Sequence, residues 1–86
     1  MTDVFGSYSP INCEFHDVLE ALATTRKPAA IRFLDERGVA QLRMATVDDL
    51  YARNGAEYLS LSSGDIVRLD RILDADGEIL KNYRDS

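Results

Sequence analysis

The sequence predicts a small α+β domain that is mainly β, in which an N-terminal amphipathic helix caps a strongly bent antiparallel sheet of five strands. Three observations support this prediction. Apolar residues recur with helical spacing as far as Thr25, and the pattern changes to strand-like alternation after Pro28. The apolar runs that follow are short and are separated by turn residues. Five strands of this length can curl into a partly open barrel, which removes most of the exposed sheet edge.

The length and composition indicate one globular domain. The 86 residues, 45% of them apolar, are enough for a single small core. We expect residues 1–7 to be a flexible lead and residues 8–86 to form the domain. Cys13 is the single cysteine, which excludes an internal disulfide and indicates a reducing compartment. Because we find neither a secretion signal nor an apolar run of about 20 residues, we expect a cytoplasmic protein that does not bind membranes.

The helix is predicted over residues 8–27. Its apolar positions follow the i, i+4, i+7, i+8, i+11 spacing of a buried stripe: Ile11, Phe15, Val18, Leu19 and Leu22. The Asn12 side chain is placed to accept a hydrogen bond from a backbone N–H of the first turn. Arg26 and Lys27 supply a basic last turn, and Pro28 ends the helix. One face of this helix is therefore apolar and the other is polar.

Residues 29–73 are expected to form the barrel strands. The alternation predicts four strands, at residues 29–34, 39–46, 57–62 and 66–73. A turn ending in glycine, residues 35–38, joins the first two. Residues 46–49 resemble a helix-capping sequence, so a single helical turn is expected after them, through Leu50 and Tyr51, ended by residues 53–55. Residues 74–86 are expected to form a short fifth strand or a helical tail.

Most of the net negative charge comes from the predicted helix and the residues before it. The chain has a formal net charge of −5, and no Lys or Arg precedes Arg26. The acidic residues before that point are Asp3, Glu14, Asp17 and Glu20. Nucleic-acid binding normally depends on Lys and Arg that neutralise phosphates, so direct binding to nucleic acid is not expected. The segregated charge suggests a basic partner instead, and the alternative is that the acidity serves solubility alone.

The polar face of the helix gathers Cys13, His16, Asp17 and Glu20, at i, i+3, i+4 and i+7. Three interpretations compete: a face whose carboxylates meet Arg or Lys of a partner protein, a metal site, or a solvated face with Cys13 partly buried. Four ligands along one straight helix span about 10 Å, at 1.5 Å per residue, so they cannot all reach one ion. The chain has no other Cys or His to complete a set. We therefore expect no metal and no cofactor.

No catalytic arrangement stands out in the sequence. A nucleophile–histidine–acid set would have to be built from Cys13 and His16 on an exposed helix, without a nearby oxyanion hole or glycine-rich turn. The chain also lacks a phosphate-binding loop. We expect that the protein is not an enzyme.

Three groups of motifs occur in order along the chain. The first is Tyr8-Ser-Pro-Ile-Asn-Cys13, followed by His16-Asp17 and Leu19-Glu20. The second is Asp49-Leu-Tyr-Ala-Arg-Asn54, leading to Glu57-Tyr-Leu59, and the third is Arg68-Leu-Asp-Arg-Ile72. Together they resemble the Rho-binding antiterminator family (Rof), small bacterial proteins that inhibit the transcription termination factor Rho. The resemblance covers roughly residues 8–73, and its first motif is the most specific.

The resemblance implies an Sm-like barrel preceded by a helix, in agreement with the fold predicted from the hydrophobic pattern. It also implies binding to the N-terminal domain of Rho, whose basic, pyrimidine-preferring primary site is then kept from loading RNA. The residues expected to bind the partner lie on the helix and in the loop before the third strand: Cys13, Glu14, His16, Asp17, Glu20, Arg53 and Asn54. The free protein is expected to be a monomer.

Two alternative functions stay open at this point. An Sm-like barrel could bind RNA itself, although the net charge and the scatter of arginines among acids disfavour it. A generic interaction domain could use the acidic helix to bind another basic protein surface. For Arg53 and Asn54, the alternative is that Asn54 and Gly55 only end a helical turn.

Overall fold

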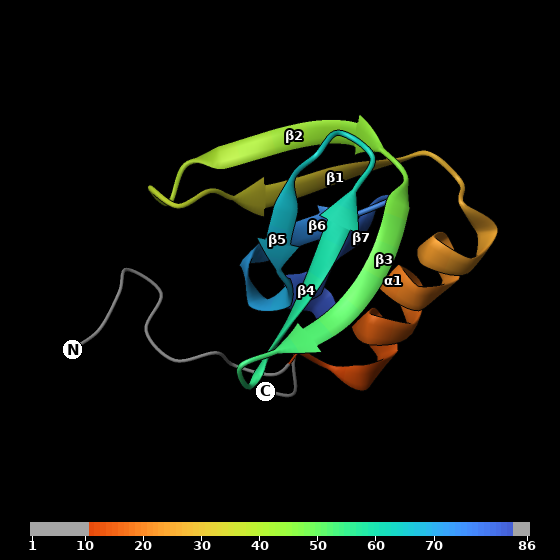
Figure 1. Cartoon of the computed structure of the whole chain (residues 1–86), viewed down its shortest axis with the longest axis horizontal. Coiled ribbons are helices and arrows are strands. Elements are labelled where there is room, and N and C mark those ends of the chain that lie inside the picture. The colour runs from red at the N-terminus through yellow and green to blue at the C-terminus, as the bar shows by residue number, and fades with distance from the viewer. Residues whose placement is uncertain (1–10, 84–86) are drawn as a thin grey trace.

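The computed structural model describes residues 11–83, which form an α+β domain with one N-terminal helix and two antiparallel sheets (Figure 1). The predicted fold class, one helix followed by antiparallel strands, is confirmed at this level. The flexible lead expected at residues 1–7, the motif residues 8–10 and the end of the expected tail, residues 84–86, lie outside the described residues. Within residues 11–83, no helix is long and apolar enough to cross a membrane.

Helix α1 (Cys13–Thr25) is shorter than the helix predicted over residues 8–27. Asn12 is its N-cap, as predicted, and the Asn12 Oδ1 accepts a hydrogen bond from the backbone N–H of Glu14 at 2.7 Å. At the other end, Arg26 adopts the left-handed conformation with φ of 55°, and its N–H closes the last turn. The helix therefore ends before Arg26 and Lys27, and its last turn contains no basic residue, so the prediction of a basic last turn is wrong.

Seven strands make up the two sheets in the described residues. The first sheet has the order β2-β1-β6-β7 and the second has the order β3-β4-β5. The strands are β1 (Ala29–Leu34), β2 (Ala40–Ala45), β3 (Val47–Arg53), β4 (Ala56–Leu61), β5 (Ile66–Arg68), β6 (Ile72–Ala75) and β7 (Glu78–Ile79). A 3₁₀ helix, Leu80–Tyr83, follows β7, so the expected tail contains both a short strand and a helical turn. The described residues thus form seven strands in two sheets, not five strands in one closed barrel, so the predicted number of strands is wrong.

Strand β3 replaces the helical turn that was predicted before Gly55. Asn54 and Gly55 form a two-residue hairpin turn between β3 and β4, with φ of 53° and 82°. Tyr51 and Tyr58 lie opposite each other on the two strands, and their rings stack with centroids 5.7 Å apart. The Asn-Gly dipeptide is a strong hairpin signal, and in the folded chain it outweighs the capping pattern that begins at Thr46.

The strand predicted at residues 66–73 is divided into β5 and β6 by a 3₁₀ helix, Leu69–Arg71. Val67 and Leu69 are both buried and two residues apart, as in a strand, but the next buried residue is Ile72, three positions on. This change of spacing requires a turn if all three side chains are to reach the core. The turn carries the chain from the second sheet into the first.

The other crossing between the sheets is at Thr46, the single residue between β2 and β3. Its backbone N–H donates to the Ser62 Oγ, and its carbonyl accepts from the Ser62 N–H, both at 3.0 Å. β2 and β3 therefore form a nearly continuous segment that bends from one sheet into the other (Figure 1).

The core is formed by side chains from α1 and from both sheets. The helix contributes Phe15, Leu19 and Leu22, all buried, and it packs mainly along β3 (Figure 1). Burying each such side chain is worth about 1.5–3 kcal/mol relative to leaving it exposed. Val18 and Ile11 also pack against this core, but Ile11 precedes the N-cap, so the predicted stripe is confirmed within the helix from Phe15 to Leu22. The opposite side of α1 is thereby held toward solvent.

Candidate functional site

The polar residues predicted on the helix lie on the side of α1 that the core does not cover. We call this surface the outer face of α1, and it consists of Cys13, Glu14, His16, Asp17 and Glu20. All are exposed except His16, of whose side chain 25% is exposed. Their placement follows from the helical period, because the buried stripe occupies the opposite side.

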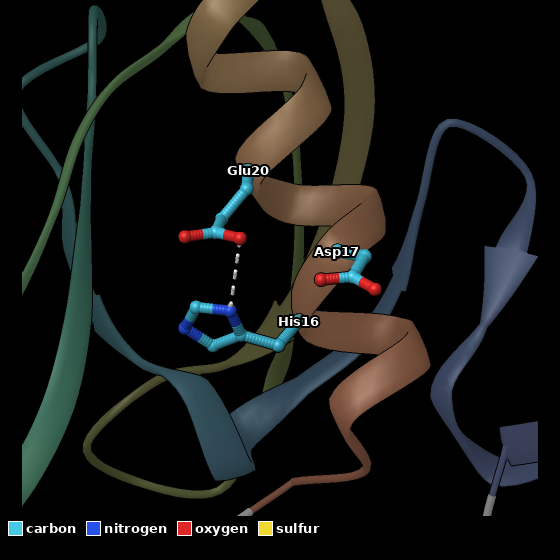
Figure 2. A group of neighbouring side chains, drawn as sticks. All are labelled: His16, Asp17 and Glu20. Carbon is cyan, nitrogen blue, oxygen red and sulfur yellow. Dashed lines mark ion pairs between the residues drawn. The ribbon is translucent and has the colours of Figure 1, made fainter.

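His16 lies between two carboxylates. Its Nδ1 is 3.7 Å from the Oε1 of Glu20, one turn further along α1, and its Nε2 is 3.5 Å from the Oε2 of Glu57 on β4. Figure 2 shows the imidazole and the Glu20 carboxylate facing each other, with Asp17 on the adjoining side of the helix. The sequence analysis names Glu57 within the second motif but does not place it among the site residues. Only the docking of α1 onto the sheet brings this side chain to His16.

A groove of about 220 Å³ lies beside His16. Its lining includes the carboxylate residues Glu20 and Glu57 and the stacked rings of Tyr51 and Tyr58. Carboxylates attract cations, and the faces of aromatic rings also attract cations. The groove therefore suits a positively charged group.

Three arginines of the sheets, unlike the carboxylates of this face, are paired with oppositely charged side chains nearby in the fold. Three ion pairs show this: Arg32–Asp74 at 2.6 Å, Arg43–Asp65 at 2.9 Å and Arg68–Asp70 at 2.7 Å. Neither Asp17 nor Glu20 is paired with an arginine or a lysine within residues 11–83. The outer face of α1 thus carries negative charge that this part of the chain does not compensate.

Arg53 and Asn54 lie apart from the outer face, at the exposed tip of the β3–β4 hairpin. Asn54 has positive φ and forms the turn itself, together with Gly55. In the described part of the chain, no hydrogen bond or ion pair joins Arg53 or Asn54 to the outer face of α1. The structure therefore brings the five helix residues to one surface and leaves these two at a separate exposed position.

The outer face offers charge attraction and metal coordination. Among the described residues, His16, Asp17 and Glu20 have ligand atoms within 4.8 Å of one another. Cys13 does not belong to this group, and no hydrogen bond joins it to His16 within residues 11–83. The thiol–imidazole pair that a cysteine nucleophile would use is not formed there.

Comparisons of the chain with models of protein families, with characterised proteins and with solved structures find no match in any of the three. What the chain does must therefore be inferred from the outer face of α1 and from the sequence motifs. Both lead to the same helix, because the most specific motif runs directly into its first turn.

Proposed function

We propose that this protein is a non-enzymatic inhibitor of Rho-dependent transcription termination, which binds the N-terminal domain of Rho and blocks its primary RNA-binding site. The observation that carries the proposal is the uncompensated negative charge of the outer face, on a helix anchored by its buried stripe. The motif resemblance supplies the identity of the partner. A cytoplasmic location and a monomeric free state belong to the same proposal.

The proposed mechanism is competition for basic groups of Rho. Lys and Arg side chains that hold RNA phosphates would instead meet the carboxylates of Glu14, Asp17 and Glu20. Charge-assisted hydrogen bonds of this kind speed the encounter and fix the orientation of the complex. The bulk of the two sheets would then cover the pyrimidine pockets, and Rho would fail to load RNA.

The groove beside His16 supports a more specific contact with one arginine of the partner. A guanidinium group binds carboxylates through its fork of N–H donors and stacks on aromatic faces. Glu20 and Glu57 supply the carboxylates, and Tyr51 and Tyr58 supply the aromatic surface. An arginine inserted here would set the register of the complex, while the rest of the outer face supplies general attraction.

An Sm-like arrangement is the finer part of the proposed fold. If β2 and β3 are taken as one strand bent at Thr46, the elements after α1 are β1, the bent strand, β4, β5, a 3₁₀ helix and β6. This order amounts to five strands in an open arrangement, with β7 added at the edge of the first sheet. The hydrogen bonds between Thr46 and Ser62 at the bend support it.

Charge reversal at two positions tests the proposed function. Asp17→Lys with Glu20→Lys makes the outer face positive and leaves the buried stripe intact. The matched control, Glu36→Lys with Glu78→Lys, makes the same change in net charge at two exposed positions outside α1. We expect the first variant to lose roughly a hundredfold or more in affinity for Rho, because like charges then face each other. The control is expected to bind as the parent protein does, with pull-down and titration of Rho as the measurements.

Circular dichroism of both variants verifies that the fold is retained. Equal affinities of the two variants for Rho would contradict a mechanism that depends on the outer face. The affinity of the parent protein should also fall as salt rises from about 50 to 300 mM, because salt screens the attraction. A flat response to salt would count against the electrostatic part of the mechanism.

Titration with short C-rich RNA in the absence of Rho separates the proposal from the RNA-binding alternative. We expect no binding at micromolar concentration in moderate salt, because the helix is acidic and three sheet arginines already hold carboxylates. Micromolar binding of the RNA would favour an Sm-like RNA-binding module instead.

A further inference from the structure

Three side chains of types that commonly bind metal ions meet on the outer face of α1. His16, Asp17 and Glu20 each offer one ligand atom, and these atoms lie within 4.8 Å of one another (Figure 2). The spacing argument against a metal site includes Cys13, and four residues along the helix are too far apart for one ion. Without Cys13, the remaining three span little more than one helical turn. The positions of these three side chains therefore permit a metal site that the spacing of all four residues excludes.

We propose that His16, Asp17 and Glu20 bind a divalent transition-metal ion such as Zn²⁺, through His16 Nδ1 and the two carboxylates. With metal–ligand bonds of about 2.0–2.2 Å, two ligand atoms of a tetrahedral site lie roughly 3.4 Å apart. His16 Nδ1 and Glu20 Oε1 are 3.7 Å apart, which is close to that separation and long for a hydrogen bond. Asp17 is exposed, so its carboxylate is free to rotate toward the ion.

Glu57 supports the site from a different element of the fold. Its Oε2 is 3.5 Å from His16 Nε2, the ring nitrogen that faces away from Glu20. A metal-bound imidazole commonly donates its second N–H to a carboxylate, which fixes the orientation of the ring and makes it a better ligand. With Nδ1 on the metal, Nε2 carries the proton and Glu57 accepts it in a hydrogen bond. Glu57 lies on β4, so its position beside His16 is not a consequence of the i, i+4 spacing within α1.

The site is accessible and held in place. The His16 side chain is 25% exposed and borders the groove, so an ion and its water ligands can enter. The Asn12 cap and the buried side chains of Phe15 and Leu19 fix the backbone that carries the ligands. One imidazole nitrogen with two carboxylates suits Zn²⁺, Ni²⁺ or Co²⁺, whereas Mg²⁺ and Ca²⁺ prefer sites built of oxygen. Three protein ligands leave the fourth position of a tetrahedral ion to water.

Titration of the untagged full chain with the metal alone tests this inference. Calorimetry with Zn²⁺ should show saturable binding of one ion per chain, and Co²⁺ should develop the visible absorption of a bound ion. His16→Gln should abolish this binding. Asp17→Asn and Glu20→Gln should each weaken it without disturbing the packing. Glu57→Ala should weaken it by roughly 10- to 100-fold, as the loss of a hydrogen-bond partner of a ligand does.

Two variants serve as controls. Glu78→Ala removes an exposed carboxylate outside α1, and Cys13→Ser removes the thiol one turn before His16; both should bind Zn²⁺ like the parent protein. The inference is overturned if binding does not saturate, if His16→Gln binds normally, or if Cys13→Ser loses binding. Equal affinities for Mg²⁺ and Zn²⁺ would overturn it too, since they would indicate an unspecific acidic surface. Because the probe is the metal alone, the outcome does not depend on whether Rho is the partner.

Discussion

The charged residues of the sheets and those of helix α1 are arranged in opposite ways. In the sheets and their turns, three arginines hold aspartates, and in two of these pairs, Arg32–Asp74 and Arg43–Asp65, the partners are far apart in the sequence. On α1 the carboxylates face solvent, and the ion-pair partner of Glu20 is the imidazole of His16 rather than an arginine. Charge that is paired within the fold contributes to its structure. Charge left uncompensated on one surface remains available to attract a cation or a basic partner.

The largest difference in stability is expected between substitutions of two adjacent residues that lie on opposite faces of α1. Leu19→Ala removes a fully buried side chain and should lower the free energy of unfolding by about 2–5 kcal/mol. Glu20→Ala changes an exposed side chain and should alter it by no more than about 0.5 kcal/mol. Urea unfolding followed by circular dichroism measures both. A large loss for Glu20→Ala would show that the outer face serves stability, and the contrast with the sheets would disappear.

Two arginines of the sheets, one paired with an aspartate and one exposed, allow a similar comparison of stability. The side chain of Arg68 is 10% exposed and donates two hydrogen bonds to Asp70, at 2.7 and 3.0 Å, whereas Arg53 is exposed at a hairpin tip. Arg68→Ala takes a charged partner from a largely buried carboxylate and should cost about 1.5–3 kcal/mol of unfolding free energy. Arg53→Ala should cost about 0.5 kcal/mol or less. Similar small losses in the two unfolding curves would mean that the paired charges contribute little to the fold.

A lysine added to α1 should separate stability from binding. Thr24 is exposed and lies four residues after Glu20, so Thr24→Lys creates an i, i+4 acid–base pair in the last turn of the helix. This pair and the helix dipole should raise the free energy of unfolding by about 0.5 kcal/mol. The affinity for Rho should fall, because the new cation compensates part of the negative charge. A parallel rise of stability and affinity would contradict the role given to the outer face.

The smallest effect on stability is expected from substituting Asp35, which closes the β1–β2 turn. Hydrogen bonds from the Val39 N–H, the Gln41 side chain and the Arg37 N–H lower the pKa of Asp35 below the usual 3.8. Because its pKa is lower in the folded state, the Asp35 carboxylate stabilises the fold fully at a pH above the unfolded-state pKa. This contribution is lost as the pH falls through the folded-state pKa. Asp35→Asn should therefore be less stable than the parent protein near neutral pH, and the two should converge in strong acid. Urea unfolding near neutral pH and in strong acid measures the difference in stability between the two proteins. A difference that does not change with pH would refute the stabilising role of the Asp35 carboxylate.

Helix α1 and the first hairpin were predictable from the sequence because their determinants are local. The Asn12 cap and the apolar spacing lie within the helix, and the turn ending at Gly38, with φ of 80°, lies between the strands that it joins. The β3–β4 hairpin also has a local signal in Asn54 and Gly55, but the capping pattern ahead of it favoured a helical turn. The division of β5 from β6 was not predicted, because it follows from which sheet each buried residue enters.

For the site, the helical period was enough to predict which residues of α1 face outward, since it places them opposite the buried stripe. The partners of these residues depend on how distant segments pack together. Glu57 reaches His16, and Arg32 reaches Asp74, through strand register and the docking of α1 onto the sheet. A shift of register by two residues would keep the same side chains turned toward the core, so the hydrophobic pattern does not specify these distances. The packing of the whole chain does.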